Sequence, residues 1–140
     1  MAKSKAINTA SKGLRKLARQ FPMWAAQALN EEAEETMTAS KAITPVSRVK
    51  GKPGGRLRRS GRVHHATTKD LLALLTYGTD YAVYVHEIPA PPAKSSGGRS
   101  ATHKPPTQWK YLETPVNERS AKFSQRIANG IKQKLGKLGV

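Results

Sequence analysis

The sequence predicts an α+β fold in which long helices pack on a small antiparallel sheet. Near both ends of the chain, apolar residues recur every three or four positions, which is the period of a helix. Between these regions, two short runs that favour strands are separated by a turn signal, which is typical of a hairpin. The 140 residues suffice for one domain with a modest core, and we expect 1–140 to form it.

The first helical stretch, residues 3–20, is basic and amphipathic, with Leu14 and Leu17 on its apolar side. Pro22 fits the first turn of a helix but disrupts a helix interior. We therefore expect a second helix from about Pro22 to Ala42, so that the N-terminal helical region is long and kinked near Pro22. Its second half carries a narrow stripe of small apolar side chains, which would let another element approach closely.

A hairpin is expected next, with residues 61–68 paired with 70–77 and lying against the second half of the long helix. The leucine-rich second strand is short and flanked by turns, which favours a buried strand. Residues 108–113 are expected to be extended. Thr114 is a candidate N-cap and Pro115 a first helical residue, so a C-terminal helix should begin there.

The most aromatic stretch is 77–87, where Gly78 to Asp80 ends the strand and the following residues recur at helical spacing. A short amphipathic helix is predicted after this break. We interpret the aromatic side chains as core, with a binding or catalytic cluster as the alternative. The expected motif and core residues are Tyr77, Tyr81, Tyr84, Val85, Trp109, Tyr111 and Leu112.

The chain carries 25 Lys and Arg residues against 9 Asp and Glu, a net charge of +16. Such an excess predicts an anionic partner, which could be nucleic acid, an acidic protein surface or an anionic membrane. No apolar run approaches the roughly 20 residues that span a bilayer, and we expect neither a secretion signal nor a membrane partner.

A basic loop is expected at 47–62, where seven of sixteen residues are Lys or Arg and glycines disfavour regular structure. Such a loop suits the phosphate backbone of DNA or an acidic partner, and it lacks the ending of a phosphate-binding loop. A simple solvated loop is the alternative. The expected contact residues are Arg48, Lys50, Lys52, Arg56, Arg58, Arg59 and Arg62.

Four of the nine acidic residues lie between 31 and 35, on three sides of the predicted helix. No histidine follows at metal-ligand spacing, so a solvated or intersubunit face is predicted there. The Pro/Gly-rich loop 89–106 is long enough to reach a neighbouring subunit. The expected subunit-interface residues are Glu31, Glu32, Glu35, Lys94, Arg99 and Lys104.

The residues give little indication of catalysis. There is no cysteine, which excludes disulfides, thiolate metal sites and a cysteine nucleophile. Four histidines occur without metal-ligand spacing, and the best acid–base pair is His86 with Glu87. No nucleotide fingerprint or nucleophile elbow is present. We expect neither a cofactor nor an enzymatic activity.

Three short segments occur in order, at 44–46 with 55–61, at 77–87 and at 110–118. They read Thr-Pro-Val with Gly-Arg-Leu-Arg-Arg-Ser-Gly, then Tyr-Gly-Thr-Asp-Tyr-Ala-Val-Tyr-Val-His-Glu, then Lys-Tyr-Leu-Glu-Thr-Pro-Val-Asn-Glu. Together they resemble the small tail-component (minor capsid) family of long-tailed bacteriophages over about residues 20–135. The chain departs from that pattern by a basic insertion from Ser47 to Gly54 and by the longer loop 89–106.

This resemblance implies a structural virion protein that acts at the head–tail neck, in tail completion or head–tail joining. It implies a homo-oligomeric ring of six copies around the DNA channel, assembled in the host cytoplasm. Its partners would be a stopper or adaptor, a tail terminator or tube, and genome DNA held without sequence preference. A tail terminator that caps the tube is the near alternative, and a free sequence-independent DNA-binding protein is the alternative from another class.

Overall fold

The structure is a computed structural model that describes residues 2–46, 53–87 and 107–137, without the side chains of residues 2–7. It has the expected α+β architecture, in which a long N-terminal helix and C-terminal helices accompany one small antiparallel sheet. The elements in order are α1 (Ala2–Ile43), α2 (Arg56–Ser60), β1 (Gly61–His64), β2 (Leu74–Tyr77), α3 (Ala82–Glu87), α4 (Glu113–Ser120) and α5 (Phe123–Gly136).

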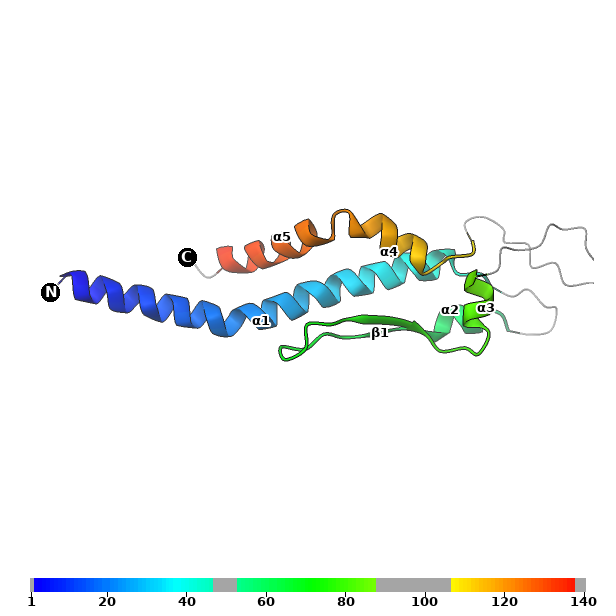
Figure 1. Cartoon of the computed structure of the whole chain (residues 1–140), viewed down its shortest axis with the longest axis horizontal. Helices are drawn as coiled ribbons and strands as arrows, with labels where there is room; N and C mark the ends of the chain where they lie inside the picture. The colour runs from blue at the N-terminus through cyan, green and yellow to red at the C-terminus, as the bar shows by residue number, and fades with distance from the viewer. Residues whose placement is uncertain (1, 47–52, 88–106, 138–140) are drawn as a thin grey trace, which may run out of the picture.

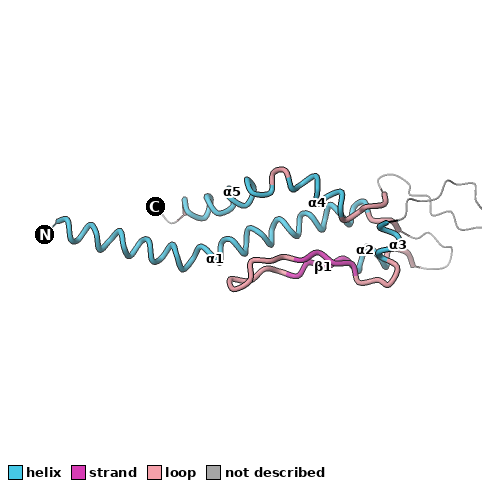
Figure 2. Tube along the Cα trace, viewed as in Figure 1, coloured by secondary structure: helices cyan, strands magenta, loops and turns pink. Residues whose placement is uncertain are grey.

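The described elements form an elongated body with α1 as its middle layer. The β1–β2 hairpin lies along one side of α1, and α4 and α5 run back along the other side (Figure 1). Figure 2 shows the same arrangement as two helical layers and one strand pair. The short helices α2 and α3 lie together at the end of the body where α1 finishes.

Helix α1 is one element of 42 residues that continues through Pro22. A second helix does not restart at the proline, and the long helix instead changes direction about midway (Figure 1). Proline has no N–H to donate and its ring crowds the carbonyl four residues before it, so a bend is the usual consequence. The predicted kinked helix is confirmed.

The predicted hairpin is confirmed, with Gly61 opposite Tyr77 and His64 opposite Leu74. The paired strands are shorter than expected because Asn30 of α1 binds the backbone just beyond them. Its Oδ1 accepts from the Ala66 N–H at 2.7 Å and its Nδ2 donates to the Ala66 carbonyl at 3.0 Å. These bonds occupy the groups that would otherwise continue the ladder.

The prediction of a buried leucine strand is wrong. Leu71 and Leu72 lie in the loop before β2, and their side chains are 50% and 55% exposed. Leu74 lies within β2 and is half exposed as well. A two-stranded sheet covers α1 with one face only, and no described element packs against its other face.

The hairpin is fixed to α1 by close packing and by a buried hydroxyl network. A side chain at Gly61 would lie 2.9 Å from the Met37 sulfur, so glycine permits this approach of strand and helix. The Tyr77 hydroxyl lies 2.7 Å from the Ser40 hydroxyl and 2.9 Å from that of Thr44. Ser40 and Thr44 are fully buried, so this network satisfies groups that water cannot reach.

The small core gathers at the end of α1 around Leu57, Ala82 and Tyr111. The Tyr111 hydroxyl donates to the Ala82 carbonyl at 2.9 Å, and its ring meets that of Tyr77 edge to face. Burial raises the pKa of Tyr111 to about 12. Val85 packs on the same cluster.

Several expected core aromatics are instead at the surface. Tyr81 is 36% exposed, Tyr84 66% and Trp109 41%. Because α3 has only six residues, it buries its Ala82 and Val85 side and leaves the other side without a neighbour. Tyr77, Val85, Tyr111 and Leu112 do belong to the core and its margin, as predicted.

Two expectations about the C-terminal part are corrected. Residues 109–112 form bends and a turn rather than an extended segment, and Lys110 adopts a left-handed φ of 55°. The C-terminal helix is divided into α4 and α5, and α4 begins at Glu113 without a side-chain N-cap. At the division, Arg126 donates to the Arg119 carbonyl at 2.6 Å and satisfies that helix end.

Replacing Tyr77 by Phe tests the hydroxyl network. We expect Tyr77→Phe to lower the free energy of unfolding by about 1–2 kcal/mol, because the buried Ser40 hydroxyl loses its partner on the strand. Urea denaturation measures the change. In the matched variant Tyr84→Phe, whose ring is mostly exposed, stability should stay within about 0.5 kcal/mol of the wild type. Equal losses in the two variants would contradict the role given to the network.

Candidate functional site

The strongest electrostatic feature of the described chain is Glu32, a carboxylate on α1 that is only 5% exposed. Arg126 of α5 donates to both of its oxygens at 2.6 and 2.7 Å. Arg119 of α4 does the same at 2.8 and 3.1 Å. One buried carboxylate therefore holds both C-terminal helices on α1 through paired, charge-assisted bonds.

Burial by itself raises the pKa of Glu32, because the charged form loses water. The hydrogen bonds and positive charges of Arg126 and Arg119 together outweigh burial and hold the pKa below its ordinary value. The same pairing with Glu32, and then with Glu35, raises the pKa of Arg119. The cluster is ionised at neutral pH and acts as an internal clamp.

The expected solvated or intersubunit face at 31–35 is therefore corrected for Glu32, which is buried between α1, α4 and α5. Glu35 binds Arg119 but is 64% exposed, and Glu31 is 69% exposed with Lys134 at 3.9 Å. Intersubunit contact through Glu31 and Glu35 stays a prediction. The sequence could not reveal the arginine partners, because they lie about ninety positions further along the chain.

The basic loop is more ordered than predicted. Arg56–Ser60 forms α2, which lies on the core through the buried Leu57. Arg58 donates to the Thr44 carbonyl at 2.9 Å, beyond the end of α1, and Arg59 donates to the Gly54 carbonyl at 3.0 Å. For residues 56–62 the expectation of irregular structure is wrong, because Leu57 anchors α2 in the core and β1 follows directly, whereas residues 47–52 lie outside the described residues.

The remaining predicted contact residues divide into two groups. Arg56 on α2 and Arg62 on β1 are both exposed. Other predicted contact and interface residues lie outside the described residues, namely Arg48, Lys50, Lys52, Lys94, Arg99 and Lys104. Within the described part of this loop, Arg58 and Arg59 bind backbone carbonyls.

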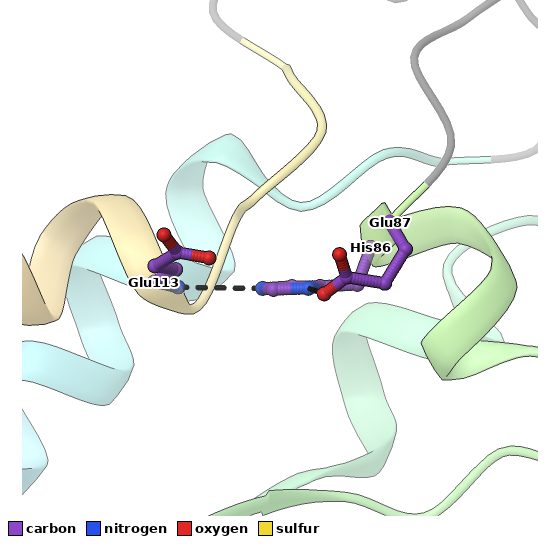
Figure 3. A group of neighbouring side chains, drawn as sticks. All are labelled: His86, Glu87 and Glu113. Atoms are coloured by element: carbon purple, nitrogen blue, oxygen red, sulfur yellow. Dashed lines mark hydrogen bonds and ion pairs between the residues drawn. The ribbon is translucent and has the colours of Figure 1, made fainter.

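His86 and Glu87, the candidate acid–base pair, lie close to Glu113 where α3 approaches α4 (Figure 3). His86 Nδ1 lies 2.7 Å from Glu87 Oε1, and the Glu113 N–H donates to His86 Nε2 at 3.3 Å. The imidazole thus accepts a hydrogen bond from a backbone N–H that has no partner within the first turn of α4. Its ring also meets Tyr111 edge to face.

Lys110 completes this second cluster. Its ammonium lies 2.7 Å from Glu87 and 2.8 Å from Glu113. Hydrogen bonds to Glu113 and then Glu87 raise the pKa of Lys110, and bonds from Lys110 and then His86 lower the pKa of Glu87. The left-handed backbone at Lys110 costs about 1–2 kcal/mol in strain, which these contacts help to offset.

The ligand atoms of His86, Glu87 and Glu113 lie within 4.8 Å of one another, a spacing that a metal ion could use. The residues fit such an ion poorly, because the Lys110 ammonium is bound to both carboxylates and would repel it. Both nitrogens of His86 also have partners already. We interpret the group as a polar clamp between α3 and α4.

A basic face on the N-terminal half of α1 is a further candidate surface. Lys12, Arg15, Lys16 and Arg19 border one shallow hollow together with Gln20. The sequence indicated a basic amphipathic helix here, but it assigned the face no role.

None of the helices in the described part of the chain has the length and apolar character of a membrane span.

No protein-family model matches the chain, no curated protein matches its sequence, and no solved structure matches its fold. The candidate surfaces are therefore interpreted from their own geometry.

Replacing Glu32 by Gln tests the buried clamp. Glu32→Gln keeps the shape but removes the charge partner of Arg126 and leaves Arg119 with the exposed Glu35 alone. We expect a loss of about 2–3 kcal/mol in the free energy of unfolding at pH 7, below the value for a fully buried pair because both arginines retain some exposure. The control Glu34→Gln, whose carboxylate is 56% exposed, should change stability by less than about 1 kcal/mol.

The pH dependence follows from the lowered pKa of Glu32. The contribution is fully present above the ordinary value of 4.5 and is lost as the pH falls through the lower folded-state pKa. Denaturation curves should therefore show the difference between wild type and Glu32→Gln shrinking below about pH 4.5. A difference that is constant from neutral to acidic pH would contradict a charged Glu32 clamp.

Proposed function

We propose that this protein is a structural component of the bacteriophage neck, which completes the tail and joins it to the DNA-filled head. The resemblance of residues 44–61, 77–87 and 110–118 to the small tail-component family supports this proposal. So does the order of elements, since that family implies a long N-terminal helix over a small antiparallel sheet and a C-terminal helix, and the chain has this arrangement.

The observation that carries the proposal is the imbalance between exposed and buried apolar side chains. Among the described residues, nine hydrophobic residues are buried and five of them are alanine. Twelve large hydrophobic residues are exposed over the same residues. Exposed apolar surface on this scale marks a protein that buries its side chains against a partner. The exposed residues are Leu14, Phe21, Met23, Leu71, Leu72, Leu74, Tyr81, Val83, Tyr84, Trp109, Val116 and Phe123.

The exposed residues occupy several elements, which suits a subunit with neighbours on more than one side. The hairpin contributes Leu71, Leu72 and Leu74, and α3 contributes Val83 and Tyr84. A closed ring uses two different faces of each subunit, and a neck ring also contacts components above and below it. We propose a homo-oligomeric ring of six copies, as the resemblance implies, in the virion at the top of the tail.

The hairpin leucines provide a direct test of assembly. We expect the double variant Leu71→Gln, Leu72→Gln to keep its fold, because both side chains are half exposed, and to lose self-association. Sedimentation velocity measures the oligomer, and circular dichroism checks the helices. Lys69→Gln in the same loop is the matched control and should assemble like the wild type. A monomeric wild-type protein, or an unaffected double variant, would contradict the role given to these leucines.

The proposed role in the virion is tested with a phage that carries a nonsense codon at Trp24. Electron microscopy of the lysates should show full heads beside separate tails of normal length, because the tail lacks the component that joins it to the head. Abnormally long tail tubes would assign the protein to tail termination instead. Intact infectious particles would contradict a place in the neck.

A further inference from the structure

We propose that the N-terminal half of α1 carries a face that binds the phosphate backbone of duplex DNA without sequence preference. The face consists of Lys12, Arg15, Lys16 and Arg19 and is called the cationic face below. These positions are separated by three, four and seven residues, so they share one side of the helix. The inference deepens the proposed function and rests on it for the source of the DNA.

The cationic face lies where α1 has no covering layer. In Figure 1, the N-terminal part of α1 extends beyond both the hairpin and α5. Between residues 8 and 20 every described side chain is exposed or half-buried, and Leu14 is 66% exposed. The face is therefore open to a ligand along its whole length.

The cationic face continues the side of α1 that the hairpin covers further along. Asn30 binds the hairpin backbone at Ala66, and Lys12 lies eighteen residues before it, which is five turns at 3.6 residues per turn. Arg19 precedes Asn30 by eleven residues, close to three turns. On this side of α1, the residues that contact the hairpin are small or polar, and the residues beyond the end of the hairpin are cationic.

Among the described residues, no carboxylate pairs with these cations. Residues 2–30 of α1 contain no Asp or Glu, and the first is Glu31. It lies twelve residues beyond Arg19, or about 18 Å along the helix, which exceeds the screening length of about 8 Å at physiological salt. Among the described contacts the four cations have no carboxylate partner, whereas Arg119, Arg126 and Lys134 have theirs.

Four like charges on one side of a helix repel each other and weaken the helix by a few tenths of a kcal/mol per pair. A polyanion removes this penalty. The face spans seven residues, about 10 Å, and duplex DNA carries one charge per about 1.7 Å of axis, or roughly six over that length. The density of positive charge therefore suits a nucleic acid backbone.

DNA is favoured over an anionic membrane by the position of the apolar stripe on the same helix. Leu14, Leu17 and Phe21 recur at spacings of three and four, and the series continues to Trp24 and Ala28. Trp24 and Ala28 are buried, and a side chain at Gly130 of α5 would lie 3.4 Å from Ala28. From Trp24 onward the stripe lies under the layer formed by α5, on the side away from the cations. Its uncovered part is therefore limited to Leu14, Leu17 and Phe21, which is shorter than the apolar face that membrane-surface helices bury in lipid.

The test uses the full-length protein and two labelled 30-base-pair duplexes of unrelated sequence, with fluorescence anisotropy measured over a range of salt concentrations. We expect equal affinities for the duplexes and an affinity that falls with salt. In the triple variant Arg15→Gln, Lys16→Gln, Arg19→Gln, the slope of log affinity against log salt should become shallower by about 3, or roughly 0.9 for each lost phosphate contact.

The matched control is Lys69→Gln, Lys122→Gln, Lys132→Gln, three exposed cations on the hairpin loop and around α5. Both triple variants lower the net charge from +16 to +13, because each removes three positive charges from the value for the whole chain. The control should keep the wild-type slope. An equal change in both variants would overturn the proposal, since attraction would then depend on net charge and not on this face.

Vesicles of phosphatidylcholine with phosphatidylserine are titrated in parallel. Binding to vesicles that depends on the cationic face, with no binding to DNA, would overturn the proposal in favour of a membrane. These measurements use the purified protein and leave aside whether the phage assembles. Loss of head–tail joining in the Trp24 nonsense phage together with no DNA binding would refute this inference alone. Intact phage particles together with DNA binding that depends on the cationic face would refute the neck function alone.

Discussion

Helix α1 is buried on two opposite sides, and this constraint shapes the rest of the structure. A helix that accepts a hairpin on one side and two helices on the other needs small side chains on both, which accounts for the buried alanines Ala26, Ala28 and Ala33. Small side chains bury little apolar area. The layers are therefore held by polar groups to an unusual degree.

Two buried polar networks secure the two layers. On one side the Tyr77 hydroxyl joins Ser40 and Thr44, and on the other Glu32 binds Arg119 and Arg126. Both networks are directional, so each fixes the position of a layer along α1 as well as its distance. Buried polar groups that are fully satisfied specify one arrangement, whereas a purely apolar contact between small residues could slide.

The two ends of the elongated body also differ in character. The compact core around Leu57 and Tyr111 lies where α1 finishes, together with α2, α3 and the beginning of α4. The opposite end is an uncovered, cationic stretch of α1. A subunit of this shape can contact neighbouring subunits near its core and present positive charge at its far end, which is the arrangement proposed for a ring around DNA.

The sequence predicts the helices at both ends, the hairpin pairing and a bend in the helix that contains Pro22, because these depend on local periodicity and on the chemistry of single residues. It also determined that the chain is strongly basic. It did not determine which charges are free. Glu32 has the same neighbours in sequence as Glu34, yet one is buried between arginines and the other is exposed.

The tertiary structure assigns the roles of the candidate site residues, which the sequence could not. It joined Arg58 to a carbonyl beyond the end of α1, placed Leu57 in the core, and turned the leucines of the hairpin outward. Among the described contacts, it also left Lys12, Arg15, Lys16 and Arg19 without a carboxylate partner, where α1 extends beyond the hairpin and α5. These outcomes depend on contacts between segments that are thirty to ninety residues apart in the chain. Such contacts cannot be predicted from residue type and local spacing.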